Sequence, residues 1–416
     1  MTGIRLALQN YKLQMGPEAW HNFRCDLTAS VLFSLFNVVF NQFYIPMAIR
    51  QGATDLQVGI LAAAPAVGLL FSPIWAYWIQ RTSSPKPFMI FPNLFGRALI
   101  LLPALFGTPL VFVTAAIGFH LLMGIQAPAY AALVSRLYPP QQRGRLMGNV
   151  RVAMGLLMIP LAYLVGFWTD AAGSGWPLAL ASVTGILSIL IFARVREAAS
   201  SSAPSVSAQR MSLKAQWGLV RGNRKLMIFF VATTLAGFGN LLANPLYQII
   251  QVDRLALTDV QIGVARVVYY VFLLTTYYVI GWAIDRFSAG RTIVYGVAAY
   301  AVVPLLYALV PGYPTVLIGS GVQGIGDAIW DIGILTFVNS IAPGREAVVF
   351  GLHLMLFGIR GTAAPLLGTS LSGSVPLPWL LVAASVCGVL GTLTLLPGSR
   401  KEARANLAGN VRDIEA

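Results

Sequence analysis

Twelve long apolar runs decide what this chain of 416 residues can fold into. A helix of about 20 apolar residues crosses the ~30 Å hydrocarbon core of a bilayer and satisfies its own backbone hydrogen bonds there. Only 10% of the residues are charged, which excludes an ordinary cytosolic enzyme. We therefore expect an all-α membrane protein with twelve transmembrane helices. The runs lie near residues 27–49, 56–79, 87–107, 110–134, 146–168, 176–194, 226–250, 260–284, 290–310, 314–338, 347–371 and 376–397.

The basic residues indicate an orientation in the membrane. If both termini are cytoplasmic, 23 of the 28 Lys and Arg residues fall in cytoplasmic segments, and the opposite face keeps only Arg50 and Arg254. Lys and Arg concentrate on the cytoplasmic side of short loops. The pattern predicts a multi-pass protein of the cytoplasmic (inner) membrane with both termini inside. It also explains the net charge of +14 without a nucleic-acid partner.

One long polar stretch divides the chain. It contains the flexible sequence SSSAPSVS and then MSLKAQWGLV, which has the pattern of a short amphipathic helix on the membrane surface. We expect an N-terminal six-helix half at 1–194, a cytoplasmic linker at 195–225, a C-terminal six-helix half at 226–397 and a cytoplasmic tail at 398–416.

The two halves repeat one another. TDLQVG at 54–59 returns as TDVQIG at 258–263, and AYWIQRTSSPK at 76–86 returns as GWAIDRFSAGR at 281–291. Parallel six-span repeats of this kind describe two pseudo-symmetric membrane halves related by an axis along the membrane normal.

With these features the chain resembles the major facilitator superfamily over nearly its whole length. The most specific motif is the loop between the second and third spans of a half, where the family carries Gly, then Asp-Arg, then Gly-Arg. The second half matches at Gly281, Asp285, Arg286, Gly290 and Arg291. The resemblance implies a secondary transporter that is not an enzyme, in which this loop is a gating latch.

The first half departs from that motif. Ala76, Gln80, Arg81 and Lys86 stand in the corresponding places, so the acidic anchor is absent. The latch is therefore expected in the second half alone. HLLMGIQAP at 120–128 resembles the family's proton-antiporter motif, with His120 where that motif has Arg, and it leaves the subfamily open.

Charged side chains inside the apolar runs are candidates for function, because they are costly in hydrocarbon. Asp327 and Asp331 lie one turn apart, and Gln323 lies on the same helix face one turn earlier. By depth in the membrane, Arg360 matches Asp327 and His353 matches Asp331, so we expect these four to couple transport to protons. The alternative is a carboxylate held by a neighbouring Arg that only locks the helix bundle.

Polar stripes repeat in the first span of each half, which the resemblance places along the central cavity. The stripes either bind substrate or join helices by hydrogen bonds. Arg97 is expected mainly to support the helix bundle. Arg266 is expected to lie beside tyrosines. The expected substrate-binding residues are Asn37, Asn41, His120, Asn240, Asn244, Gln323 and Trp330.

The glycines of GSGVQGIGD at 319–327 have the spacing of a phosphate loop but follow no strand, so they indicate close helix packing instead. The chain has no ATP-binding loop, which excludes a primary pump acting alone. Cys25 and Cys387 have no metal-ligand spacing. We expect no metal and no cofactor.

We expect a secondary active transporter of a small solute that works by alternating access, with protons and the lipid bilayer as its other partners. Proton-coupled export of a small amphipathic compound by an antiporter is favoured slightly, because the expected cavity lining is aromatic and weakly polar. The first alternative is uptake of an organic anion or sugar-like solute. The second, from another class, is a membrane sensor or scaffold that transports nothing.

Overall fold

A computed structural model describes residues 16–79, 81–138, 140–197, 213–287, 289–341 and 346–415. Within these ranges the regular elements are helices, with no strand. Eleven helical segments of the described chain are long and apolar enough to cross a membrane. The one expected span that is not among these eleven is the tenth in chain order, α15 (Tyr313–Ile341). It is 29 residues long, and Gln323, Asp327 and Asp331 lower its mean hydropathy. The expected all-α membrane fold is confirmed.

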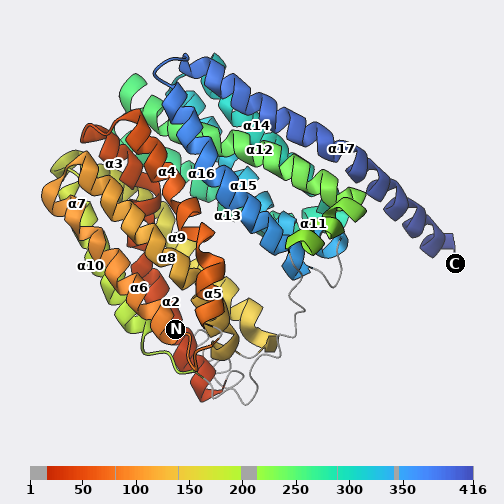
Figure 1. The fold of residues 1–416 in the computed structure, drawn as a ribbon, viewed down its shortest axis with the longest axis horizontal. Coiled ribbons are helices and arrows are strands. Elements are labelled where there is room, and N and C mark those ends of the chain that lie inside the picture. The colour runs from red at the N-terminus through yellow and green to blue at the C-terminus, as the bar shows by residue number, and fades with distance from the viewer. Residues whose placement is uncertain are drawn as a thin grey trace, which may run out of the picture. The chain divides into compact units, whose positions relative to one another are not determined.

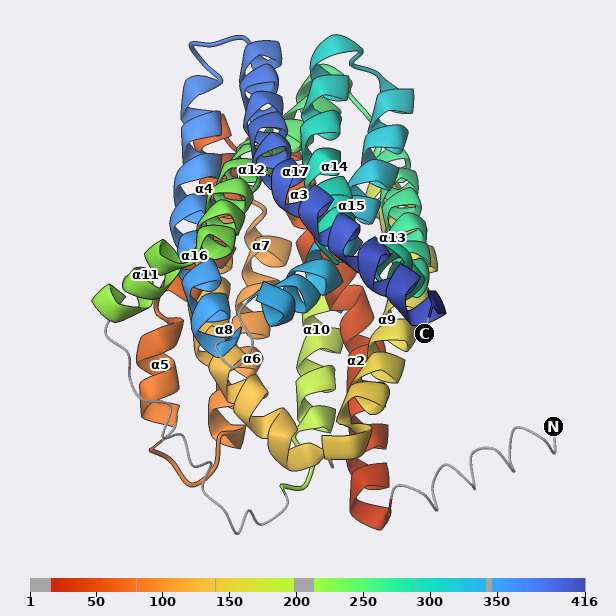
Figure 2. The same ribbon diagram turned by 90° about the vertical axis from the view of Figure 1, so that its right-hand side faces the viewer.

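The chain forms two compact units, drawn in Figure 1 and Figure 2. Unit 1 contains residues 1–52 and 67–206, and unit 2 contains residues 53–66 and 207–416. The boundary at 206/207 lies within the expected linker. The segment 53–66, however, belongs to unit 2, although it lies early in the N-terminal half of the sequence.

Unit 1 is a bundle of helices that begins at Pro17. Proline is preorganised for the first helical position, and the preceding Gly16 takes a positive φ of 77°. The first helix starts about ten residues before its apolar run, so Asp26 lies inside it. The elements are α2 (Pro17–Val38), η1 (Val39–Phe43), α3 (Tyr44–Arg50), α5 (Ser72–Ile79), α6 (Lys86–Leu99), α7 (Leu101–Phe106), α8 (Pro109–Leu137), α9 (Pro140–Ala172) and α10 (Gly175–Phe192).

Unit 2 contains the remaining helices. Its helices α12, α14 and α17 pack side by side (Figure 1). The last helix, α17, continues to Glu415, through the segment expected as a polar tail. The elements are α4 (Asp55–Leu70, of which residues up to 66 belong to this unit), α11 (Leu213–Gly222), α12 (Arg224–Ile249), η2 (Ile250–Arg254), α13 (Asp259–Phe287), α14 (Ala289–Leu309), α15, α16 (Glu346–Leu371) and α17 (Leu377–Glu415).

The repeated TD-x-Q sequences form the same structure twice. The backbone N–H of Thr54 donates to the side chain of Gln57 at 2.9 Å, and the Gln57 N–H donates back to the Thr54 hydroxyl at 3.3 Å. Thr258 and Gln261 make the same pair of bonds at 3.0 and 3.2 Å. Each pair is a capping box that satisfies N–H groups at a helix start. This local repeat therefore begins α4 and α13.

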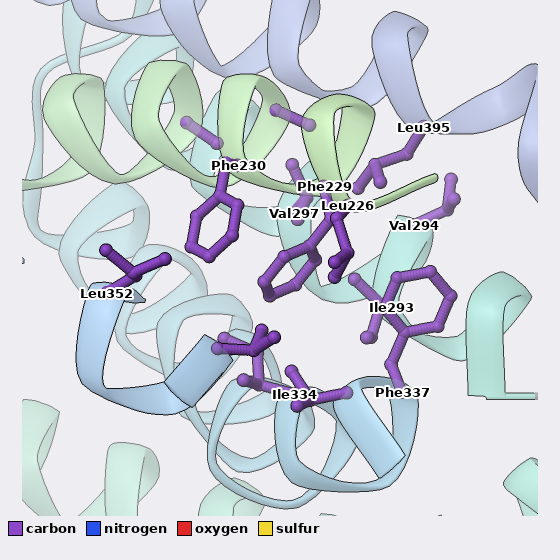
Figure 3. Close-up of a cluster of buried hydrophobic side chains, with 14 of the residues drawn as sticks. Leu226, Phe229, Phe230, Ile293, Val294, Val297, Ile334, Phe337, Leu352 and Leu395 are labelled. Atoms are coloured by element: carbon purple, nitrogen blue, oxygen red, sulfur yellow. The ribbon is translucent and has the colours of Figure 1, made fainter. Parts of the chain in front are cut away.

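Apolar side chains fill the inside of each unit and also cover its outside. In unit 2, Leu226 and Phe229 of α12 pack against Ile293 of α14 and Ile334 of α15 (Figure 3). On the outside, Trp176 is 69% exposed. Further exposed apolar side chains include Leu105, Phe106, Leu110, Leu309 and Trp379. Exposed apolar surface on this scale is what a bilayer covers.

Candidate functional site

A cluster of neutral hydrogen-bond donors surrounds Asp327 in the middle of α15. The hydroxyl of Tyr269 donates to Oδ2 of Asp327 at 3.0 Å, and the hydroxyl of Tyr300 donates to Oδ1 at 2.9 Å. The amide of Gln323 donates to Oδ1 at 3.0 Å from one turn earlier. These donors come from α13, α14 and α15 of unit 2. They hold a carboxylate in the membrane segment without using a basic side chain.

Asp331 lies one turn further along α15 and has a different environment. Its Oδ2 accepts a hydrogen bond from the Tyr277 hydroxyl at 2.5 Å, and its side chain is exposed. The two carboxylates therefore lie on one helix face, as expected. One is enclosed by tyrosines and the other is open.

Glycines of α15 bring the tyrosines to Asp327. A Cβ built on Gly324 would lie 2.5 Å from the carbonyl oxygen of Tyr269, and one built on Gly326 would lie 3.0 Å from the Cβ of Ala299. Larger residues would push α13 and α14 away from α15. The expectation that this glycine pattern serves close helix packing is confirmed.

Arg360 and His353, which were matched by depth to the two carboxylates, both lie beside Trp330. Nη1 of Arg360 donates to the backbone carbonyl of Thr233 at 2.5 Å, and its guanidinium lies 5.8 Å from the Trp330 ring. The His353 ring packs against Phe229 and Trp330. No ion pair joins Arg360 to Asp327 in the described part of the chain, because Asp327 is already surrounded by hydroxyl and amide donors.

The two asparagine stripes lie in different units. Asn37 is in α2 and Asn41 is in the π-helical turn η1 of unit 1, where Asn41 is exposed. In unit 2, Asn240 and Asn244 lie one turn apart in α12. The side-chain oxygen of Asn240 is buried and has no hydrogen-bond partner among the described residues. An unsatisfied buried oxygen is costly unless a ligand or water supplies a donor.

The other expected substrate residues divide into two environments. His120 packs in unit 1 against the rings of Phe40 and Phe119, at 5.4 and 5.1 Å between centroids. Trp330 packs in unit 2 against Tyr300 at 5.5 Å, next to the Asp327 cluster. Trp330 and Gln323 therefore belong to one site with Asp327, whereas His120 belongs to an aromatic cluster of unit 1.

The expected gating residues lie around the end of α13. A Cβ at Gly281 would meet nothing within 4 Å, and the guanidinium of Arg286 lies 5.9 Å from the Trp282 ring. Arg291 lies in α14. The side chain of Asp285 and the whole of Gln80 lie outside what the structure describes.

Sequence reasoning missed Glu197, which supplies an acidic group near the divergent loop of unit 1. Its Oε2 pairs with Nη1 of Arg136 at 3.3 Å, and its Oε1 accepts a hydrogen bond from Ser84. Lys86 of the same loop donates to the carbonyl of Val195 at 2.8 Å. Glu197 lies in the polar linker of the sequence, so no local pattern connects it with residues 84–86.

Asp26 and Tyr300 were also missed. Asp26 directly precedes the first apolar run, yet it is buried and accepts a hydrogen bond from Tyr138 at 2.7 Å. Tyr300 is one tyrosine within a long apolar run. The described residues contain no group of three His, Cys, Asp or Glu side chains that could hold a metal ion.

Comparisons with known proteins agree with this architecture. A model of the family described as Major Facilitator Superfamily matches residues 27–239 and 229–412. A mutant of the nucleoside transporter NupG matches with a TM-score of 0.70 at 15% identity, covering 91% of this chain and 99% of that one. No curated protein sequence matches the chain.

Two further solved structures have the same fold. A bacterial homolog of the human lysosomal transporter Spinster matches with a TM-score of 0.68 at 12% identity, covering 92% of this chain and 97% of that one. An auto-inhibited peptide transporter of the POT family matches with a TM-score of 0.72 at 11% identity, covering 91% and 96%.

Proposed function

The chain belongs to the major facilitator superfamily of membrane transporters, and from this premise we propose that it carries a small solute by alternating access coupled to protons. In this mechanism, rocking of two halves exposes a midplane site first to one side and then to the other. The distribution of Lys and Arg supports a location in the cytoplasmic membrane with both termini inside.

The observation that carries proton coupling is the pair Asp327 and Asp331. Asp327 is held by hydroxyl and amide donors rather than by an ion pair, so it can gain or lose a proton without leaving an unpaired basic group beside it. Asp331 is exposed, and it lies one turn away. In the proposal, Asp331 exchanges protons with water and Asp327 exchanges them with the substrate site. His353 and Arg360 both contact Trp330, which packs against Tyr300 of this site.

The surroundings of Asp327 favour an amphipathic substrate. Tyr269, Tyr300 and Trp330 offer aromatic faces beside a carboxylate, which suits a compound with an apolar body and a cationic or hydrogen-bonding group. Proton-driven export of such a compound is our first candidate. Uptake of an organic anion or sugar-like solute is the second, and the unpartnered oxygen of Asn240 favours a solute with hydroxyl donors.

The test uses purified protein in proteoliposomes that contain a pH-sensitive dye. A thermal-shift screen first identifies a solute that stabilises the folded protein. Substrate-dependent proton flux is then measured for native protein, for Asp327→Asn and for Asp331→Asn. Both variants are expected to insert and bind but to lose proton-coupled flux, whereas Asp253→Asn, outside the Asp327 cluster, keeps it.

Full proton-coupled flux in both variants would exclude these carboxylates as the coupling groups. If instead no solute on a broad panel is moved across the bilayer by native protein, a sensor or scaffold becomes the better interpretation.

A further inference from the structure

Unit 1 contains a partly open cavity that the proposed transport site does not use. Its volume is about 410 Å³, and α2, α6, α8, α9 and α10 all contribute to its wall. None of the residues expected to bind substrate or to carry protons lines it. Two buried groups of opposite charge line it, namely Asp26 and Arg97, and the exposed Arg151 lines it as well.

Arg97 forms one charged end of the cavity. Its side chain is 6% exposed, and its guanidinium lies 4.5 Å from the Phe33 ring. Nη1 donates to the carbonyl of Gly185 at 2.6 Å and to the Ser188 hydroxyl, and Nη2 donates to Asn93 at 3.0 Å.

These acceptors are all neutral, and Nε of Arg97 has no partner in the described part of the chain. A guanidinium carries further N–H donors on Nε and Nη2, in a fork that matches a carboxylate. A buried positive charge without an anion is costly. Arg97 therefore offers an unfilled position for an acidic group.

Asp26 forms the other charged end. It is 5% exposed, and its Oδ2 accepts from the Tyr138 hydroxyl at 2.7 Å. Its Oδ1 accepts a long hydrogen bond of 3.5 Å from Ser30. No Lys or Arg side chain bonds to it among the described residues. Its carboxylate thus has capacity left for a strong donor such as an ammonium group.

The two ends are separated by an apolar wall. Asp26 and Phe33, the residue whose ring lies beside Arg97, are seven residues apart on α2, so their backbone positions differ by about 10 Å along the helix axis at ~1.5 Å per residue. The wall also includes the apolar side chains of Met89, Met123 and Phe192. Methionine side chains adapt to the shape of a flexible apolar chain.

We propose that this cavity binds a small amphipathic zwitterion. Its acid accepts hydrogen bonds from the Arg97 guanidinium, its amine donates to Asp26, and an apolar body fills the space between them. The site lies wholly within unit 1 and stands whether or not Asp327 and Asp331 couple transport to protons.

The probes are 4-aminobutanoate and 8-aminooctanoate, which carry an acid and an amine at the two ends of a short and a long chain. Binding to the purified full-length protein is measured by calorimetry, beside butanoate, octanoate and octylamine. The tighter-binding zwitterion is expected to bind at least tenfold more tightly than the acid of the same length and than octylamine. Equal affinity for that acid would overturn the proposal, because Arg97 alone would then account for binding.

Variants locate the site. Asp26→Asn is expected to weaken the tighter-binding zwitterion at least tenfold while leaving the acid of the same length unchanged. Met123→Trp keeps both charged groups but fills the cavity, so it should abolish binding even if Asp26→Asn fails to fold. Asp327→Asn should bind this zwitterion as native protein does. Unchanged binding in Met123→Trp, or lost binding in Asp327→Asn, would place the ligand elsewhere and contradict the proposal.

Discussion

Tyrosine hydroxyls donate hydrogen bonds to Asp327, where a buried carboxylate usually pairs with a basic residue. Tyr300 donates at 2.9 Å and is itself buried. A hydrogen bond to a charged group contributes about 1.5–3 kcal/mol. Loss of one hydroxyl should therefore disturb the site without removing the carboxylate.

Tyr300→Phe is accordingly expected to slow proton-coupled transport about tenfold at saturating substrate, since a factor of ten corresponds to about 1.4 kcal/mol. The matched control is Tyr295→Phe on the same helix, whose ring is 63% exposed and which should transport normally. The measurement is the initial rate in proteoliposomes. Equal rates for both variants would mean that the Tyr300 hydroxyl does not act on Asp327 during transport.

At this scale the sequence identified some of the residues and missed their partners. Asp327 and Asp331 could be selected because charged side chains are rare within apolar runs. Their tyrosine donors could not be found, because a tyrosine in an apolar helix looks the same whether it bonds to a carboxylate or faces lipid. Asp26 was lost because a helix start cannot be read to within a few residues from hydropathy alone.

Helix starts in this fold depend on local bonds that can be removed one at a time. Thr258→Ala removes the hydroxyl that accepts from the Gln261 N–H at the start of α13. The loss of such a cap costs about 1 kcal/mol. Thermal unfolding should show lower stability for Thr258→Ala, whereas Thr258→Ser should keep native stability. If Thr258→Ser were as unstable as Thr258→Ala, the Thr258 hydroxyl would not contribute to the stability of the helix start.

Helix contacts in unit 2 depend on small residues. A Cβ on Gly239 of α12 would lie 2.3 Å from the carbonyl oxygen of Ala384 on α17, whereas one on Gly351 of α16 would meet nothing within 4 Å. Gly239→Ala should therefore lose about 1–3 kcal/mol through overpacking. Gly351→Ala should be neutral or gain up to about 1 kcal/mol through helix propensity. Thermal shifts of the same sign and size for both variants would contradict this account.

Elements were easier to predict than sites. Apolar runs of membrane-spanning length leave the helix as the one available structure, so the existence of the spans followed directly. The repeated TD-x-Q sequences begin α4 and α13 in the same way, because a capping box is a local pattern. Hydropathy could not predict the π-helical turns η1 and η2, nor the extension of α17 to Glu415. These depend on backbone geometry and tertiary contacts rather than on composition.

For the whole molecule, the resemblance to the family motif predicts a latch at Asp285. Asp285 lies in the last turn of α13. If its carboxylate forms hydrogen bonds only when the cytoplasmic side is closed, those bonds stabilise the closed state relative to the open one. Asp285→Asn is expected to shift the equilibrium by about 1–2 kcal/mol toward the state open to the cytoplasm. Gln80→Ala, at the corresponding place of the first half, should shift it little.

The measurement is the rate at which single cysteines on α15 are labelled from each side of the membrane, in a background lacking Cys25 and Cys387. Asp285→Asn should increase labelling from the cytoplasmic side and decrease it from the other. Identical rates in Asp285→Asn and native protein would mean that this loop does not bias the transport cycle.

The assignment of residues 53–66 to unit 2 has a consequence for how the protein is made. Asp55 accepts a hydrogen bond from Ser372, which directly follows α16 and lies 317 residues later in the chain, and Gly59 leaves room for Thr369 of α16. A ribosome adding about 5–20 residues per second needs roughly 15–60 s to make the 317 residues between them. During that interval the second span waits in the bilayer without its final partner. The second span therefore gains its final contacts only after residue 372 has been made, and lipid or the insertion machinery must cover this helix face until then.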